Sequence, residues 1–278
     1  MIREPAPRKL NVLGTGVSAT SYCGMLRLCR AWLDERTAGP ESAKPARCTV
    51  ILTVHSITVA WLDREYRKAL NAADVGTPDG MPIVWALRSL GAAAQERVYG
   101  PELMIAVCGQ AARLGHRVYL YGGREEMLPR LRENLLARFP ALRIAGLYSP
   151  PFRALTPEED AACVRNIRES GADIVFVGIG TPKQERWMHS HAERLPGTVL
   201  FGVGAAFDFH AGRVRQAPGW MQGAGLEWAF RLCMEPLRLW KRYLMLNPLF
   251  ITLWLLQRLG FAAWPLPTAG HSAAERTV

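Results

Sequence analysis

The feature that most constrains the fold is a repeated pattern of a short β-rich run, a turn and a helical segment. The runs are almost wholly apolar, which is typical of strands buried on both faces of a parallel sheet. They cover residues 49–54, 118–121, 174–177 and 199–201. Helical patterns follow or separate them over residues 57–73, 81–90, 101–114, 127–139 and 157–169. This alternation predicts an α/β fold: a doubly wound, Rossmann-like parallel sheet with right-handed crossovers.

The chain changes character towards its C-terminal end. Residues 1–226 are predicted to form the α/β body, with a surface loop over residues 37–47. Residues 227–264 become helical, basic and rich in large apolar side chains, and they are predicted to form an amphipathic appendage. Residues 265–278 are small and polar, and they are predicted to be disordered. The charge-free run 243–257 is interrupted by Asn247-Pro248 and is shorter than the roughly 20 residues of a membrane-spanning helix.

Charge and cysteine content narrow the class of protein. The chain has 34 basic and 24 acidic residues, giving a formal net charge of +10, which favours an anionic partner. Nucleic acid, an acidic lipid surface and a phosphorylated substrate all fit that charge. The six cysteines form no CxxC pair, so reduced thiols in a cytoplasmic protein are expected. Residues 1–11 are charged and contain proline, so no secretory signal is predicted there.

The most informative turn follows the apolar run 174–177. It contains Gly178, Gly180 and Thr181, and a helix is expected to start near Pro182, with Lys183 in its first turn. Backbone N–H groups at such a helix start can hold a diphosphate, and the threonine and lysine add donors. A plain strand-to-helix turn explains the same residues equally well. Two further glycine turns, Gly14-x-Gly16 and Gly122-Gly123, are weaker candidates for the same kind of site.

A second candidate site is Asp79, in the turn Thr77-Pro78-Asp79-Gly80. Proline, aspartate and glycine in this order are typical of a turn, so Asp79 could simply cap the helix that follows. It could also be a carboxylate at the ligand edge of the sheet, where it would deprotonate an acceptor hydroxyl. The two interpretations are compatible.

Arg97 precedes a glycine turn, and it could reach a diphosphate or be an ordinary surface charge. Asp208 and His210 follow another strand-and-glycine segment, but a metal site at this pair is poorly supported. The sequence contains no Asp-x-Asp pair of the kind that holds a divalent cation against a sugar nucleotide. We therefore expect no metal, with the leaving diphosphate neutralised by arginine, lysine and backbone N–H groups.

The C-terminal segment interleaves basic and large apolar residues. Arg231, Arg238 and Arg242 are spaced to lie along one helical stripe, with Lys241 beside them. This composition predicts a helix in the headgroup layer of an anionic membrane. A core helix with solvated charges and a dimer interface are the alternatives. Nucleic-acid binding is weaker, because no recognised motif accompanies the charge.

Taken together, these segments resemble the WecG/TagA/CpsF glycosyltransferases, family 26 of the glycosyltransferase classification. The resemblance runs from about residue 49 to residue 243, with the motifs in family order. The most specific of them are Thr77-Pro78-Asp79-Gly80-Met81-Pro82 and Gly178-Ile179-Gly180-Thr181-Pro182-Lys183-Gln184-Glu185. Shorter matches include His55-Ser56-Ile57, Arg97-Val98-Tyr99-Gly100 and Tyr121-Gly122-Gly123.

The resemblance implies roles for individual residues. Asp79 would be the catalytic base of an inverting, metal-independent transfer that needs no cofactor. The residues implied in substrate binding are Thr53, His55, Arg97, Gly122, Gly178, Gly180, Thr181, Lys183 and Gln184. Thr53 is a departure, because many members carry asparagine there, and threonine lacks the amide donor. The C-terminal basic residues that would contact phosphate or membrane are Arg231, Arg238, Lys241 and Arg242. A third arginine can occur at position 241 in the family, and a lysine there offers a point charge instead of the two parallel N–H donors of a guanidinium.

The resemblance also implies the partners. A UDP-sugar would be the donor and a polyprenyl-diphosphate-linked sugar the acceptor, in the synthesis of surface polysaccharides. The moved sugar would be a hexose, an N-acetylhexosamine or its uronic acid. The enzyme would be cytoplasmic and peripheral on the inner face of the membrane, with no nucleic acid bound and a homo-oligomer possible.

Two other functions compete. A dinucleotide-dependent oxidoreductase would use the Gly14 turn, but Ser18-Ala19 stand where a full GxGxxG needs its third glycine. A non-catalytic, membrane-associated partner of a polysaccharide assembly complex is suggested by the C-terminal segment alone.

Overall fold

The computed structural model describes residues 4–37 and 44–267, apart from the side chains of residues 36, 37 and 242. The chain divides into two compact units. Unit 1 comprises Met1–Ala6, Ser21–Val50 and Val98–Arg215, and unit 2 comprises Pro7–Thr20, Ile51–Arg97 and Gln216–Val278. The domain boundaries expected from the sequence stay a prediction.

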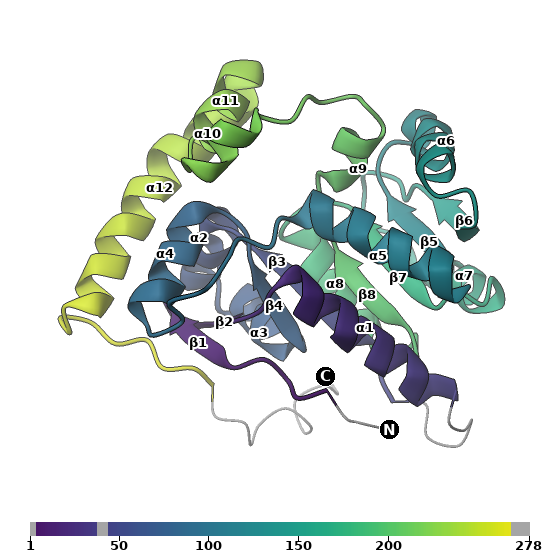
Figure 1. Cartoon of the computed structure of the whole chain (residues 1–278), viewed down its shortest axis with the longest axis horizontal. Helices are drawn as coiled ribbons and strands as arrows, with labels where there is room; N and C mark the ends of the chain where they lie inside the picture. The colour runs from purple at the N-terminus through teal and green to yellow at the C-terminus, as the bar shows by residue number, and fades with distance from the viewer. Residues whose placement is uncertain (1–3, 38–43, 268–278) are drawn as a thin grey trace. The chain divides into compact units, whose positions relative to one another are not determined.

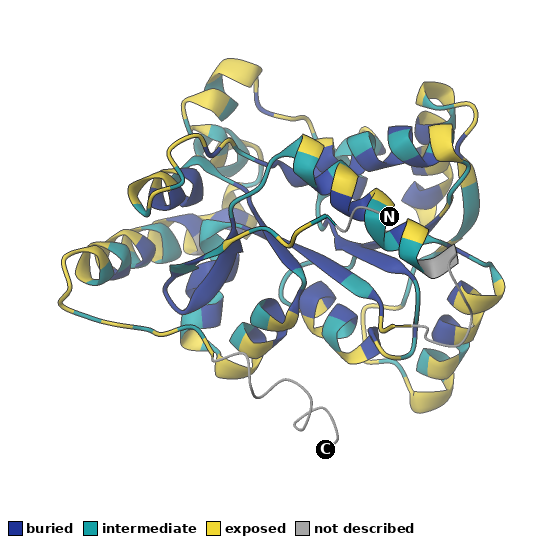
Figure 2. Ribbon diagram, turned by 60° about the horizontal axis from the view of Figure 1, so that its bottom comes forward, coloured by how far each residue is buried: buried dark blue, intermediate teal, exposed yellow. Residues whose placement is uncertain are grey.

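A six-stranded sheet confirms the predicted α/β class (Figure 1). Its strand order is β4-β3-β8-β7-β5-β6, and the pairs β3–β8, β8–β7, β7–β5 and β5–β6 are parallel. The strands are β3 (Arg47–Leu52), β4 (Val75–Pro78), β5 (Arg117–Gly122), β6 (Arg143–Tyr148), β7 (Ile174–Gly178) and β8 (Val199–Gly202). Most of their residues are buried, as Figure 2 shows, because helices flank the sheet and the strands are rich in Val, Ile, Leu and Phe.

Unit 1 places most of its helices against the parallel strands. They are α1 (Tyr22–Thr37), α5 (Gly100–Leu114), η2 (Glu125–Met127), α6 (Leu128–Arg138), α7 (Pro157–Glu169), α8 (Lys183–His191) and α9 (Ala206–His210). Helix α7 begins with a capping box, in which Thr156 and Glu159 satisfy each other's backbone N–H groups. The predicted helices over 101–114, 127–139 and 157–169 are confirmed to within one or two residues.

Unit 2 begins with a hairpin of β1 (Lys9–Val12) and β2 (Thr15–Ser18), which are antiparallel. Leu13 and Gly14 both have positive φ at its two-residue turn, as a tight hairpin requires. The interpretation of Gly14 as a dinucleotide-binding turn is therefore wrong, because this turn joins two strands and opens no helix.

The predicted single helix over 57–73 is wrong in one respect. The structure has α2 (Val54–Leu62) and α3 (Arg64–Ala72), which meet at Asp63. The Asp63 backbone is extended, and its side chain accepts a hydrogen bond from the Tyr66 N–H, so this residue ends one helix and caps the next. The apolar periodicity continues across Asp63, so the sequence pattern did not indicate the break between the two helices. Helix α4 (Met81–Ser89) follows β4, close to its predicted range.

The C-terminal part of unit 2 forms α10 (Gly219–Gly223), α11 (Glu227–Met234) and α12 (Pro236–Arg258). The expected single stripe of Arg231, Arg238 and Arg242 is wrong, because the helix is interrupted at Glu235. Its φ of −137° and ψ of 59° are not helical, and Pro236 has no N–H with which to continue α11. Within unit 2, α12 packs against α2 and buries Leu239, Tyr243, Phe250 and Leu253, which recur at helical spacing.

Two sequence expectations concern residues at the edges of the described part. The loop predicted over 37–47 contains residues 38–43, which lie outside the described residues. The disorder predicted for 265–278 falls mostly on residues 268–278, which also lie outside them. Among the described residues, no helix has the length and apolar content needed to cross a membrane.

Candidate functional site

Asp79 lies directly after β4, where the chain turns into α4. Its backbone N–H donates to the Leu52 carbonyl oxygen at 2.8 Å, which extends the pairing of the strands by one residue. Gly80 is the N-cap of α4 and has a φ of +95°, a conformation that glycine adopts without a steric penalty. No side chain forms a capping hydrogen bond at Gly80, so the N-cap position is not held by Asp79. The Asp79 side chain is nine-tenths buried.

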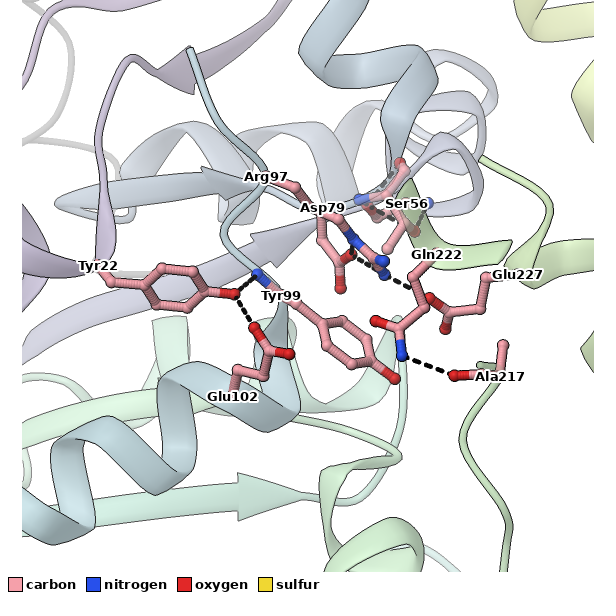
Figure 3. Close-up of polar contacts among 10 residues, drawn as sticks. Tyr22, Ser56, Asp79, Arg97, Tyr99, Glu102, Ala217, Gln222 and Glu227 are labelled. Atoms are coloured by element: carbon pink, nitrogen blue, oxygen red, sulfur yellow. Dashed lines mark hydrogen bonds and ion pairs between the residues drawn. The ribbon is translucent and has the colours of Figure 1, made fainter. Parts of the chain in front are cut away.

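The carboxylate of Asp79 is paired with Arg97, and Arg97 is also paired with Glu227 (Figure 3). Arg97 Nε and Nη2 lie 2.9 Å and 2.8 Å from Asp79 Oδ1. The same Nη2 donates to Glu227 Oε2 at 2.6 Å. All three residues belong to unit 2, and all three side chains are at most 15% exposed. One guanidinium therefore bridges two largely buried carboxylates.

The electrostatics keep Arg97 charged. Burial disfavours its cationic form, but the charges of Asp79 and Glu227 outweigh burial, so the pKa of Arg97 lies above its ordinary value. With one cation and two carboxylates, the three formal charges sum to −1. A fixed cation beside Asp79 holds the carboxylate in one place, and the second carboxylate leaves the cluster with a net negative charge.

Thr53 and His55 lie at the start of α2, in the same unit. Thr53 is the N-cap: its Oγ1 accepts from the Ser56 N–H at 3.2 Å, and its own N–H donates to Ser56 Oγ at 2.7 Å. This reciprocal arrangement is a capping box. His55 lies in the first turn of α2 and is partly exposed. The substrate contacts expected for both residues stay predictions, and the structure adds a helix-capping role for Thr53.

In unit 1, Gly122 and Gly178 end the neighbouring strands β5 and β7 side by side. A Cβ atom on Gly122 would lie 2.5 Å from the Gly178 carbonyl carbon, so the two backbones can approach only because position 122 has no side chain. Gly180 has a φ of +84° and open space around it. The predicted glycine turn thus brings bare backbone to the carboxyl ends of two parallel strands, where ligands collect in open α/β sheets.

The first turn of α8 adds polar side chains to this edge. Thr181 Oγ1 donates to Glu185 Oε1 at 2.8 Å, and Gln184 Nε2 donates to the same oxygen at 2.9 Å. Gln184 Oε1 is buried and has no hydrogen-bond partner among the described residues, which leaves an acceptor for a bound group. Lys183 is exposed. The helix starts one residue after Pro182, where the sequence predicted it.

The predicted basic residues of the C-terminal segment lie on two helices. Arg231 is on α11 and is partly exposed. Arg238 is exposed on α12 and pairs with Glu235 at 2.5 Å, while the Lys241 ammonium lies 5.5 Å from the centre of the Trp240 ring. Arg242 also belongs to α12, but its side chain lies outside the described part of the structure.

The pair Asp208 and His210 does not form a common site. Asp208 pairs with Arg213 at 2.8 Å, whereas His210 Nε2 contacts the Pro101 carbonyl oxygen at 2.9 Å. Burial lowers the pKa of His210. Over residues 4–37 and 44–267, no cluster of three or more His, Cys, Asp or Glu side chains is arranged to hold a metal ion.

The sheet and its helices define a doubly wound α/β protein, and the glycine turns lie at the carboxyl edge, where open α/β sheets bind their ligands. The chain belongs to the WecG/TagA/CpsF family of glycosyl transferases, whose family model matches residues 10–263. A similar protein from Bacillus subtilis (strain 168) is 29% identical over 210 residues, which cover 76% of this chain and 80% of the relative. Another, from Bacillus spizizenii, is 32% identical over 187 residues, covering 67% of this chain and 70% of the relative. Both relatives are N-acetylglucosaminyldiphosphoundecaprenol N-acetyl-β-D-mannosaminyltransferases.

Glu227, the second partner of Arg97, was not predicted from the sequence. From the sequence, Glu227 was only an acidic residue at the start of a predicted helix. The helix dipole favours a negative charge at that position in any protein, so the residue did not indicate a site. A separation of 130 residues from Arg97 offers no local pattern that would pair the two. The pairing of Arg97 with Asp79, 18 residues apart, was missed for the same reason.

Proposed function

We propose that this glycosyltransferase moves a hexose, an N-acetylhexosamine or its uronic acid from a UDP-sugar to a polyprenyl-diphosphate-linked sugar. Family membership supports the sugar transfer. The Bacillus relatives are named for an acceptor of the N-acetylglucosaminyl-diphosphoundecaprenol type and for transfer of N-acetylmannosamine, which supports this class of acceptor and donor sugar. The observation that carries the proposal is the buried Asp79 carboxylate, held by Arg97 at the end of β4.

In the proposed reaction, Asp79 takes the proton from the acceptor hydroxyl as that oxygen attacks the anomeric carbon of the donor. The bond between the anomeric carbon and the diphosphate oxygen breaks, and UDP leaves with the electron pair. Inversion at the anomeric carbon follows from this single displacement. A general base placed in this way contributes about 10²- to 10⁴-fold to the rate.

We propose that the glycine turn of unit 1 binds a phosphate group of a substrate. The start of α8 presents backbone N–H groups and the positive end of a helix, both of which favour an anion. Gln184 Oε1 supplies a buried acceptor for a substrate hydroxyl or amide, and Gly202 and Gly204 leave room around its side chain. Lys183 adds a positive charge at the exposed start of the helix.

The transfer is tested by screening UDP-sugars with a short-chain N-acetylglucosaminyl-diphosphopolyprenol as acceptor. We expect UDP release and an extended lipid-linked product with at least one donor, beginning with UDP-N-acetylmannosamine. Product formation in the presence of a metal chelator is the expected result for a metal-independent reaction. Vesicle binding without transfer or hydrolysis of any UDP-sugar would contradict the proposal and favour a non-catalytic role in a polysaccharide assembly complex.

We further propose that α12 lies on an anionic membrane surface at the inner face of the cytoplasmic membrane. Its face opposite the buried residues exposes large apolar side chains, among them Leu237, which is 92% exposed, Leu244 and Leu255. Arg238, Lys241 and Trp240 lie on the same helix. Apolar side chains bordered by basic groups and tryptophan suit the headgroup layer of an anionic bilayer.

Substituting Leu237 and Leu244 by glutamate is expected to weaken binding to anionic vesicles at least tenfold. Each substitution removes exposed apolar area and adds a charge of the same sign as the lipid, while both positions are too exposed to contribute much to the core. Co-sedimentation with vesicles measures the effect. Leu114→Glu, at an exposed position of α5, is the matched control and should bind as the wild type does. Equal sedimentation of the doubly substituted protein would contradict the membrane role of α12.

A further inference from the structure

Glu227 is the only residue of the C-terminal helices for which the described structure gives an ion pair to Arg97. It occupies the first position of α11, where a carboxylate is favoured by the helix dipole. Its Oε2 lies 2.6 Å from Arg97 Nη2, and its side chain is 14% exposed. Figure 3 shows the carboxylate directed at the guanidinium that also contacts Asp79.

The turn before α11 fixes where Glu227 lies. Gly225 has a φ of +74°, and a Cβ atom there would lie 3.2 Å from Met81 Cβ and 3.4 Å from the Trp85 ring. The Leu226 N–H donates to the Met221 carbonyl oxygen at 2.8 Å, which closes the end of α10. The turn that leads into α11 is therefore set close against α4, the helix that begins two residues after Asp79. These contacts, which do not involve the ion pair, hold the chain just before the glutamate.

The arrangement lets Glu227 act on Asp79 through Arg97. An arginine side chain carries about 2 kcal/mol of rotamer entropy. Arg97 Nε and Nη2 both contact one oxygen of Asp79, Oδ1, which restrains the guanidinium less than contacts with two separate carboxylates do. A second carboxylate on Nη2 holds it from the other side. The two carboxylates together fix the guanidinium beside Asp79.

We propose that Glu227 is a positioning residue for sugar transfer: it holds Arg97 in the orientation that places the Asp79 carboxylate. This inference rests on the proposed role of Asp79 as the general base. It also gives the C-terminal helices a part in the chemical step that does not depend on contact with lipid.

The test compares Glu227→Ala and Glu227→Gln in the transfer assay with a soluble, short-chain acceptor and no vesicles. Glu227→Ala is expected to lower kcat about 10- to 100-fold, because small displacements of a catalytic group are costly, while KM for the UDP-sugar changes less than about threefold. Glu227→Gln keeps the size and the acceptor oxygen and loses the charge, so its kcat should lie between those of the alanine variant and the wild type. Glu96→Gln removes the same charge at an exposed residue next to Arg97, and it should leave kcat unchanged.

A double-substitution cycle separates this role from a general effect on the fold. If Glu227 acts through Arg97, then Glu227→Ala should cause no further loss of kcat in an Arg97→Gln background. Additive losses would overturn the proposal. The proposal would also be overturned if the loss of kcat were no larger than the loss of folded protein measured by thermal unfolding. If Glu227→Ala does not fold, Glu227→Gln is used for this test instead.

Two other results would also overturn it. A lower KM for the UDP-sugar with unchanged kcat in Glu227→Ala would mean that Glu227 competes with the donor for Arg97. Wild-type kcat in Glu227→Ala, alongside an inactive Asp79→Asn variant, would remove Glu227 from the mechanism and leave the base in place. Near-normal turnover in Asp79→Asn would instead remove the base, so the two failures are distinguishable.

Discussion

The Asp79→Asn variant is expected to lose sugar transfer by about 10²- to 10⁴-fold in kcat, the range that a positioned general base contributes. Asparagine has nearly the same shape as aspartate, and its amide oxygen can still accept from Arg97, but it does not take up a proton at neutral pH. The loss should therefore appear in kcat, with KM for the UDP-sugar little changed. Steady-state transfer kinetics measure both constants.

The fold should survive this substitution. Removing one partner of a buried ion pair is costly when it leaves the other charge uncompensated. Here Arg97 keeps Glu227 as a partner at 2.6 Å, so the remaining charge stays paired. We expect an Asp79→Asn protein with a nearly unchanged melting temperature and unchanged UDP binding by calorimetry.

A matched control is available in the same unit. Asp63→Asn makes the same change of charge at the junction of α2 and α3, and asparagine is as good an N-cap as aspartate. Its kcat should equal that of the wild type. If Asp79→Asn turned over substrate nearly as fast as this control, Asp79 would not be the base.

The strands of the sheet were predictable where burial on both faces made the sequence continuously apolar. Strand β7, Ile174–Gly178, and strand β8, Val199–Gly202, are examples of such runs. Strand β4 was missed because its four residues, Val75–Pro78, contain a glycine and a proline, which locally indicate a turn. It is nevertheless this short strand that carries Asp79 to the edge of the sheet.

Residue types and motif order could identify the candidate site residues but not their partners. Asp79 and Arg97 were each singled out from the sequence, yet their pairing depends on how the chain returns after α4. Glu227 enters only because the turn before α11 lies against α4, which no local pattern encodes. The regular spacing of the arginines predicted one continuous helix, but the helix is interrupted at Glu235 and Pro236. Proline cannot donate the hydrogen bond that a continuous helix needs.

The second large effect is expected from deleting the chain from Glu227 onward. The deletion removes the buried face of α12, which packs against α2 with Leu239, Tyr243, Phe250 and Leu253. Burying each such side chain is worth about 1.5–3 kcal/mol. Together they rival the whole stability of a typical domain, about 5–15 kcal/mol. The shortened protein should therefore lose cooperative unfolding of unit 2, or melt far below the wild type.

Polar contacts at the far end of α12 add to this expectation. The Gln257 side chain accepts from the Leu13 N–H at 2.8 Å and donates to the Asn11 carbonyl oxygen at 3.1 Å. Asn11 in turn donates to the Trp264 carbonyl oxygen at 2.7 Å, and the Trp264 ring lies edge-on to Trp61. The deletion would leave the β1–β2 turn and the α2 surface without these partners.

Differential scanning calorimetry of the shortened chain, beside a chain that ends at residue 267, tests this prediction. The longer chain keeps all of these contacts and should melt as the wild type does. An unchanged melting temperature in the protein that lacks residues 227–278 would show that α12 is a detachable appendage after all. If the melting temperature falls, loss of vesicle binding after truncation cannot be attributed to lost lipid contacts, because unit 2 would be damaged as well. The exposed substitutions at Leu237 and Leu244 then become the decisive test of membrane binding, because they change the outer face of α12 and leave its packed face intact.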